Sequence, residues 1–257
     1  MYKLDKKDYS KVLPAYESVT NSKPIIFSVI DGNVAGQIYA DSCTNPKTAL
    51  IILEDMFFIS GEKNALFCME VYKLLTEVIF PSMDEKYFDF YCMTTELQTE
   101  IEDIFAAKIT GRPIRKTFEY CDEAFKNRMN WQALLPESFA MEPIDAAFAL
   151  KYKYDKEFWH YSTKRFGMAL TKENEVVSEC IACFVGGGQA EISVDTKEPF
   201  RNQGFASITS TAFIEQCYSM KLMPNWGCWD FREASIALAK KLGFIEKSST
   251  VVFGLKK

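Results

Sequence analysis

This sequence has little of three features: long apolar runs, basic stretches and histidine. No apolar run approaches the roughly 18–20 residues that a membrane-spanning helix needs. The first ten residues, MYKLDKKDYS, lack the apolar stretch of a signal peptide. The formal net charge of −5 argues against a nucleic-acid surface, because neutralising phosphates takes an excess of Lys and Arg. We therefore expect a cytoplasmic protein with neither membrane nor nucleic acid as a partner.

Metal ligands are scarce as well. His160 is the single histidine, and of the eight cysteines only Cys180 and Cys183 have C-x-x-C spacing. That pair lies in residues 176–185, whose pattern predicts a strand, and positions three apart in a strand point to opposite faces. Both thiols then cannot hold one ion, so we expect no metal. In a cytoplasmic chain the cysteines are reduced and mostly fill the core.

The composition is that of a globular protein, with 48% hydrophobic and 25% charged residues among 257. The first half predicts a helical segment at 6–18 and two strands within 24–40, joined by a hairpin turn at Asp31-Gly32-Asn33. Further patterns predict strands at 49–53, 87–93 and 114–121, and helices at 64–80 (ending before Pro81) and 96–108.

The second half repeats that order. We predict strands at 139–144, 167–170 and 176–185, with Asp145 capping a short helix and the glycines at 186–188 forming a hairpin turn into the strand that holds Glu191. A helix from Gly204, a strand at 225–230, a helix at 232–242 and a final strand at 250–255 follow. We infer an α/β protein with a mixed sheet, built from two copies of one unit: residues 1–127 and 128–257.

One stretch, residues 190–206 (AEISVDTKEPFRNQGFA), carries the chemistry. Its first part alternates like a half-buried strand. Its last part fits R/Q-x-x-G-x-G/A and opens a helix, whose first N–H groups lack partners and favour an anion. Gly204 lets the backbone approach a ligand, and the planar charge of Arg201 suits phosphate. The alternative is an ordinary turn at a glycine.

The residues that follow carry a family resemblance. Gly243 stands where a helix cap is expected, inside Lys241-Leu242-Gly243-Phe244. The R/Q-x-x-G-x-G/A loop, a strand, a helix and K-L-G-F together resemble the GNAT superfamily of acyl-CoA-dependent N-acetyltransferases. Within it the chain is similar to the zwittermicin-resistance-like branch. The resemblance is sharp over residues 134–255 and looser before them.

The resemblance implies an acetyl-CoA cleft where two parallel strands splay apart in the second unit. The residues implied to bind the donor are Val194, Asp195 and Thr196 for pantetheine, and Arg201, Asn202, Gln203, Gly204, Phe205 and Ala206 for the diphosphate. Attack by the amine on the thioester carbon is direct in this superfamily, with the N–H of Val194 as the implied oxyanion donor.

Catalytic groups are less well matched. Glu191, three residues before Val194, is the candidate general base, and the alternative is an ordinary solvent-facing glutamate. The tyrosine that protonates the leaving thiolate in many such enzymes is replaced by Ala239, which leaves Ser235 as the candidate acid. For the substrate we expect Trp229 and Asp230 to make contact, because they lie where the second splayed strand ends. Packing in the core is the commoner fate of aromatic residues such as Trp226, Trp159 and Tyr161.

The first unit lacks the donor motif. We predict its strand-to-helix loop at 54–62, where Phe58 stands three residues before Gly61 in place of Arg or Gln. Acidic residues in this loop would repel a diphosphate. We therefore expect that the first unit does not bind the donor.

The function we predict is transfer of an acetyl group from acetyl-CoA to a primary amine of a small molecule, by resemblance an aminated antibiotic. A homodimer is left open. One alternative is a non-catalytic acyl-CoA-binding module that regulates a partner, which the missing tyrosine favours. Another is a tandem GNAT-like transferase that uses aminoacyl-tRNA, which the acidic charge disfavours.

Overall fold

The computed structural model describes residues 1–121, 123, 130–153 and 164–257. The chain forms two compact units: residues 1–116 with 248–257, and residues 117–247. The sequence placed the division after residue 127, with the final strand in the second unit. The last ten residues belong instead to the first unit. Residues 127 and 128 themselves lie outside the described part of the chain.

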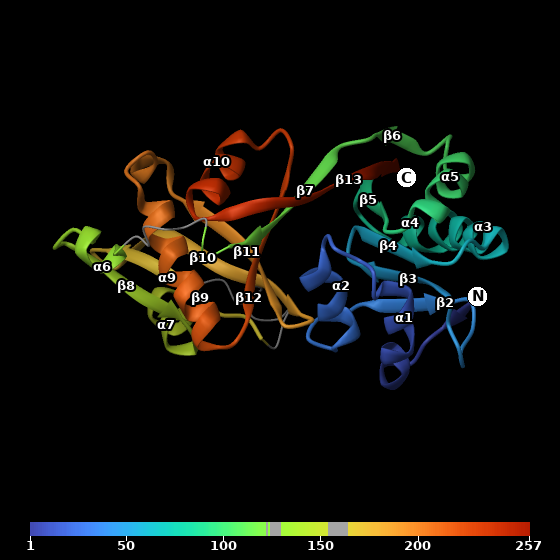
Figure 1. The fold of residues 1–257 in the computed structure, drawn as a ribbon, viewed down its shortest axis with the longest axis horizontal. Helices are drawn as coiled ribbons and strands as arrows, with labels where there is room; N and C mark the ends of the chain where they lie inside the picture. Colours follow the sequence, from blue (N-terminus) through green and yellow to red (C-terminus); the bar gives the residue numbers. More distant parts are fainter. Residues whose placement is uncertain (122, 124–129, 154–163) are drawn as a thin grey trace. The chain divides into compact units, whose positions relative to one another are not determined.

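The first unit is a mixed sheet with helices (Figure 1). Its elements in chain order are β1 (Tyr2–Lys3), η1 (Lys6–Val12), α1 (Leu13–Tyr16), α2 (Lys23–Ile30), β2 (Gln37–Ala40), β3 (Thr48–Leu53), β4 (Met56–Gly61), α3 (Ala65–Leu74), η2 (Leu75–Ile79), α4 (Phe80–Ser82), β5 (Tyr87–Cys92), α5 (Thr95–Ile104) and β6 (Ile109–Gly111). The strands run in the order β1-β2-β3-β4-β5-β13, where β13 (Phe244–Lys256) is the last strand of the chain. Its residues 252–256 pair antiparallel with β5.

The second unit is a mixed sheet crossed on one face by a long helix (Figure 1). The strand β7 (Ile114–Tyr120) begins in the first unit and continues into the second. The other elements of the second unit are α6 (Trp131–Leu134), β8 (Phe139–Ile144), α7 (Ala146–Tyr152), β9 (Gly167–Lys172), β10 (Glu175–Gly186), β11 (Gln189–Thr196), η3 (Glu198–Phe200), α9 (Phe205–Ser219), β12 (Met223–Trp229) and α10 (Glu233–Lys241). The strand order is β7-β12-β11-β10-β9-β8, and β11 with β12 is parallel. The expected α/β mixed sheet and tandem units are confirmed.

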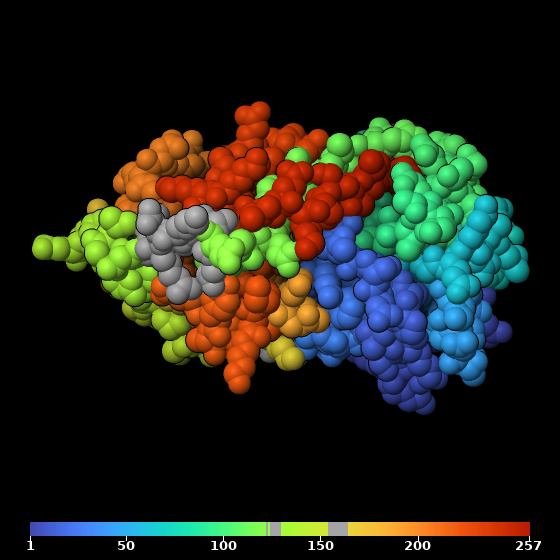
Figure 2. Space-filling view, viewed as in Figure 1, coloured from blue at the N-terminus to red at the C-terminus, as the bar shows by residue number. Residues whose placement is uncertain are grey.

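Each unit has its own hydrophobic core. The first is rich in phenylalanine: Phe57, Phe80 and Phe88 pack with ring centroids 4.2–5.9 Å apart. In Figure 2 the residues of α3 and α5, cyan to green, form a continuous surface of this unit. In the second core, Phe213 of α9 lies parallel to Phe166 at 5.3 Å and belongs to the same buried cluster as Trp226. Burial of such rings is the main stabilising contribution.

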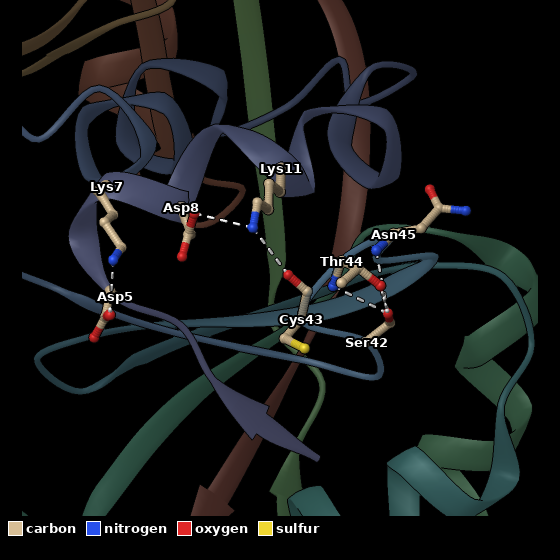
Figure 3. A network of polar contacts seen from close by, with 8 residues as sticks. All are labelled: Asp5, Lys7, Asp8, Lys11, Ser42, Cys43, Thr44 and Asn45. Atoms are coloured by element: carbon tan, nitrogen blue, oxygen red, sulfur yellow. Dashed lines mark hydrogen bonds and ion pairs between the residues drawn. The ribbon is translucent and has the colours of Figure 1, made fainter.

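Exposed polar contacts link the N-terminal segment of the first unit to the loop at residues 42–45 (Figure 3). The Lys11 ammonium lies 3.0 Å from Asp8 Oδ1 and donates to the main-chain oxygen of Cys43 at 3.1 Å. The Ser42 hydroxyl accepts the N–H groups of Thr44 and Asn45, at 3.2 and 3.1 Å. Exposed pairs of this kind stabilise by about 0–1 kcal/mol each, so they order the loop more than they stabilise the fold.

The predicted hairpin over residues 24–40 is wrong, because its first part is the helix α2. A short apolar run fits a buried strand or a buried helix equally, and in the structure most residues of this run are buried in a helix. Pro24 stands in the first turn, where a missing N–H costs nothing. The residues Asp31-Gly32-Asn33 do form a turn, but this turn ends a helix. Asp31 is the C-cap of α2, and Gly32 follows with φ 71°.

Two further boundaries in the first unit differ from the prediction. The loop expected at 54–62 is mostly strand β4, whose residues 57–60 are buried and therefore show no alternation. The connection is a tight turn in which Glu54 has φ 52°. The helix expected to stop before Pro81 continues through the π-helical turn η2 into α4, where Pro81 again lies in a first turn.

Several local predictions in the second unit are confirmed. Asp145 caps α7 by accepting the N–H of Phe148 at 2.9 Å. The glycines at 186–188 form the hairpin turn between β10 and β11, with Gly187 and Gly188 at positive φ. Gly243 ends α10 with φ 87°. The helix expected from Gly204 is α9, which ends at Ser219.

Candidate active site

The two parallel strands of the second unit part from each other. Residues 189–191 of β11 pair with 223–225 of β12, and the last pair is Glu191 with Asn225. From there β11 continues to Thr196 and β12 to Trp229, and within the described residues they are not paired over these stretches. The opening that results exposes main-chain groups at the carboxyl ends of parallel strands, the usual place for a ligand in such sheets.

The matching strands of the first unit stay together. Residues 56–59 of β4 pair with 89–92 of β5. The N–H of Met93 then donates to the oxygen of Ile59 at 2.8 Å, and the Thr94 hydroxyl donates to the oxygen of Gly61 at 3.1 Å. In the described part of the second unit, no corresponding pair joins β11 to β12 beyond Glu191 and Asn225.

A cavity of about 690 Å³ lies where β11 and β12 part. Its walls are residues 194–196 at the end of β11, Arg201 and Ala206 around the start of α9, and residues 231–235 with Leu238 at the start of α10. This volume is within the roughly 300–1,000 Å³ range of ligand pockets. Arg201 and Arg232 bring positive charge to it, and Asp195 and Glu233 bring negative charge.

The main-chain amides at the start of α9 point to an anion site. Gly204 is the N-cap of the helix, with φ 82° and without a side-chain cap. The N–H groups of residues 202–207 donate to no other group in the part of the chain that the structure describes. In the first unit the corresponding helix α3 is capped by its own chain, because Asn64 Oδ1 accepts the N–H of Phe67 at 3.1 Å.

Arg201 is held beside this helix start. Its Nε donates to the main-chain oxygen of Thr196 at 2.8 Å, and its Nη2 lies 3.8 Å from Asp195 Oδ1. The guanidinium therefore keeps other N–H groups for a ligand, at an exposed position with fixed orientation. The loop residues Asn202 and Gln203 are exposed, whereas Phe205 is buried in a small apolar cluster.

The orientation of the β11 backbone supports a role for Val194. The N–H of Lys197 donates to Val177 on β10 at 2.9 Å. Peptide groups along a strand alternate between its two edges, so the N–H of Val194 points to the other edge, from which β12 has departed. The N–H of Asp195 points back toward β10, and Asp195 contributes its side chain to the cavity instead.

Glu191 is buried and does not line the cavity. It is 2% exposed, and its Oε2 accepts a hydrogen bond from Nδ2 of Asn225. The alternative of an ordinary solvent-facing glutamate is therefore wrong. No local pattern points to Asn225 as its partner, since the two residues meet only through the pairing of β11 with β12.

Ser235 lines the cavity, and its hydroxyl oxygen accepts the indole N–H of Trp226 at 3.0 Å. Because an indole only donates, the serine proton is directed elsewhere. Ala239, at the position of the missing tyrosine, is fully buried in the core of this unit. Ser235 is thus the hydroxyl that the start of α10 brings to the cavity.

The two residues expected to contact substrate lie beside the cavity but do not line it. Trp229 is half-buried and stacks on Phe231 with centroids 6.3 Å apart. Asp230 follows it. Trp226 is a core residue, while Trp159, His160 and Tyr161 lie outside the described residues.

Sequence reasoning missed Phe231, Ala234 and Leu238 as cavity residues. The guanidinium of Arg232 lies 5.7 Å from the Phe231 ring, so these two side chains form one edge of the opening. The sequence does contain a signal for these residues. Positions 231, 234, 235 and 238 share one face at helical spacing, and that face includes Ser235, the candidate acid.

The cysteine pair has no metal-site geometry. Burial raises the pKa of the Cys180 thiol well above its ordinary value, so it stays protonated. Cys183 lies at a β-bulge and donates from Sγ to the main-chain oxygen of Glu191 at 3.3 Å. Among the described residues, no group of three or more His, Cys, Asp or Glu side chains could hold a metal ion.

No helix in that part of the chain is long and apolar enough to cross a membrane.

Comparison with known proteins places the chain in a family. The profile of the GNAT acetyltransferase family matches residues 17–253, so the chain belongs to that family. It is accordingly an acyltransferase. It is 29% identical over 255 residues to YdfB of Bacillus subtilis (strain 168), described as an uncharacterized N-acetyltransferase, covering 95% of this chain and 94% of the relative.

Solved structures show the same fold. A GCN5-related N-acetyltransferase-like protein from Streptococcus suis superposes with a TM-score of 0.70 at 19% identity, covering 98% of this chain and 99% of the other. A tandem GNAT protein from the clavulanic acid biosynthesis pathway superposes with a TM-score of 0.64 at 10% identity, covering 98% and 95%. The second likeness agrees with two units in one chain.

Proposed function

We propose that this protein transfers an acetyl group from acetyl-CoA to a primary amine of a small molecule, at the cavity of its second unit. One observation carries the proposal: parallel strands part beside a helix start whose main-chain N–H groups have no partner within the described chain. A diphosphate needs such amides, and an extended thioester arm needs the unpaired edge of β11. The cavity of about 690 Å³ joins the two.

For donor binding, the N–H groups at the start of α9 and the guanidinium of Arg201 are assigned to the diphosphate. Gly204 has a positive φ, which turns these amides toward one point. The small side chain of Ala206 leaves room for the diphosphate at the cavity wall. The residues proposed for this end are Arg201, Asn202, Gln203, Gly204, Phe205 and Ala206. The main chain of residues 194–196 is assigned to the arm, with Asp195 contributing its side chain.

For the chemical step, Glu191 removes a proton from the ammonium form of the acceptor, directly or through water. The N–H of Val194 stabilises negative charge that develops on the carbonyl oxygen. As the C–N bond forms and the C–S bond breaks, the nitrogen loses its second proton, and the Ser235 hydroxyl relays a proton, directly or through water, to the departing sulfur. A free thiol has an ordinary pKa of about 8.5, so it also leaves without a strong acid, which suits the weak acid found here.

We assign the second unit alone to donor binding, because the first has paired strands, a capped helix and acidic residues at the equivalent place. Its cavity of about 410 Å³ is lined by Glu62 and Glu96 as well as Lys47 and Lys63. For the acceptor, Trp229 and Asp230 remain our candidates beside the opening. An aminated antibiotic is the substrate type that the resemblance to the zwittermicin branch suggests.

Calorimetry and turnover measured together test this function. We expect acetyl-CoA to bind with micromolar affinity and thiol release to rise with at least one amine of a panel that includes aminated antibiotics. If calorimetry detects no binding heat on titration with acetyl-CoA, the proposed site is excluded. Binding without turnover on any amine would favour the regulatory module instead.

A further inference from the structure

Glu191 and Asn225 form the last rung of the ladder between β11 and β12. As register partners in paired strands, they place their side chains on the same face of the sheet. Nδ2 of Asn225 donates to Oε2 of Glu191, and the two residues are 7% and 2% exposed. A hydrogen-bonded polar pair therefore lies buried at the point where the strands begin to part.

The same rung of the first unit holds two stacked aromatic rings. Counted from the hairpin turn, the third pair of β4 and β5 is Phe58 with Tyr91, as Glu191 with Asn225 is the third pair of β11 and β12. The rings of Phe58 and Tyr91 lie 4.6 Å apart at an interplanar angle of 21° and are almost fully buried. In that unit the ladder continues past this rung.

Packing alone does not explain a polar pair at this rung. Stacked rings fill the rung in the first unit, so its shape does not require polar side chains. A buried carboxylate is costly, and replacing buried polar pairs by apolar ones is often neutral or stabilising. Glu191 is the only acidic side chain that is buried among the described residues. A buried carboxylate where the two strands begin to part points to a chemical role, and its amide partner is part of that role.

We propose that Asn225 is a positioning residue of the transfer reaction, which holds the Glu191 carboxylate in the orientation that accepts the proton of the acceptor amine. The inference rests on the proposed function, in which Glu191 is the base. In the step, an N–H bond of the ammonium breaks and an O–H bond forms on Glu191. Asn225 gains and loses no proton.

An amide suits this position for an electrostatic reason. It donates a hydrogen bond to the charged carboxylate and adds no charge of its own at any working pH. An aspartate here would place a second carboxylate against Glu191 and favour a shared proton. The Cys183 thiol, which faces Glu191 from β10, bonds the main-chain oxygen and leaves the carboxylate to Asn225 and its other contacts.

The test compares Asn225→Leu, which removes the donor at similar size, with Asn225→Ser, which keeps a hydroxyl donor. We expect Asn225→Leu to lower kcat about ten- to hundredfold while the Kd for acetyl-CoA stays within twofold. The acidic limb of the pH–rate profile should move up by about one unit, because the charged base loses a hydrogen bond. Asn225→Asp should move it further, and Asn225→Ser should retain most of kcat.

A double-mutant cycle makes the test specific. In the Glu191→Gln background, Asn225→Leu should cost no further activity, since it acts through Glu191. An unchanged kcat and pH profile in Asn225→Leu, or the same fold loss in both backgrounds, would overturn the inference. Asn225→Asp, which keeps the size of the side chain, provides the shift of the acidic limb where the leucine variant does not fold. If the wild-type protein binds no acetyl-CoA and acetylates nothing, the proposed function has failed instead.

Discussion

The indole of Trp226 donates to the hydroxyl of Ser235 across 3.0 Å, joining the core of the second unit to the wall of its cavity. The tryptophan ring is buried and packs against Phe244 at 5.4 Å, so its N–H is fixed in direction. A fixed donor occupies one lone pair of the serine oxygen and restricts the rotation of its O–H. The serine proton is therefore directed away from Trp226, at a residue that lines the cavity.

Ser235→Ala should lower kcat for acetyl transfer about tenfold, with the Kd for acetyl-CoA within twofold. The loss is modest because a thiol leaves readily, whereas strong general acids contribute about 10²–10⁴-fold. Thiol release under saturating donor measures it. Trp226→Phe, which keeps the ring but removes the N–H, should give a smaller loss. Equal rates for wild type and Ser235→Ala would remove Ser235 from the mechanism.

Gly204→Ala should weaken acetyl-CoA binding by about tenfold, because a side chain at φ 82° costs about 1–2 kcal/mol and shifts the amides of α9. Gly188→Ala is a matched control. Its φ is 74°, and an added Cβ meets no atom within 4 Å at either position. Gly188 lies in the β10–β11 turn, so its variant should lose similar stability and keep donor affinity. Equal Kd values in calorimetry would contradict the assignment of this loop.

Arg201→Gln should weaken donor binding about tenfold at low salt, and less at 0.5 M NaCl, because added salt screens an exposed charge on a diphosphate. Lys197→Gln removes the same charge from the neighbouring loop, where Lys197 pairs with Glu175 at 2.6 Å. We expect its Kd to stay within twofold. Identical effects of both substitutions would mean that only net charge matters.

Asn64→Ala should destabilise the first unit by about 1 kcal/mol through loss of the α3 cap. Donor affinity should not change, because we assign binding to the second unit. Urea unfolding and calorimetry on the same preparation give both quantities. A matching fall in acetyl-CoA affinity would show that the first unit contributes to the donor site.

Stability should fall at alkaline pH. Burial raises the pKa of Cys92 and Cys217 to about 12, and burial together with nearby Glu100 does so for Cys68. Unfolded thiols ionise near 8.5, so the stability that these groups contribute is complete below that pH and is lost as pH rises toward 12. Urea midpoints at pH 7.5, 9 and 10 should decrease in that order. A flat series would contradict the burial of these thiols.

The elements that the sequence predicted correctly are those whose signals are local. The Asp145 cap, the glycine turn at 186–188 and the cap at Gly243 each depend on a few neighbouring residues. The helix start at Gly204 is of the same kind. Residues 24–30 were misread because a short apolar run satisfies a strand and a helix alike, and only its surroundings distinguish them.

The candidate site divides in the same way. The loop motif located Arg201 and Gly204, and spacing located Ser235, all without long-range information. Asn225 could not be found, because it lies 34 residues from Glu191 and meets it only in the parallel ladder. Phe231 and Leu238 share a face with Ser235 at helical spacing, but only the structure shows that this face lines the cavity.

The sequence by itself determined the repeat, the family resemblance and the place of the anion-binding turn, because these follow from residues close together in the chain. Only the tertiary structure decided that β11 and β12 part while β4 and β5 stay paired, and that the final strand completes the sheet of the first unit. Strand pairing is non-local: each rung joins segments far apart in sequence, and no local pattern states where a ladder must stop.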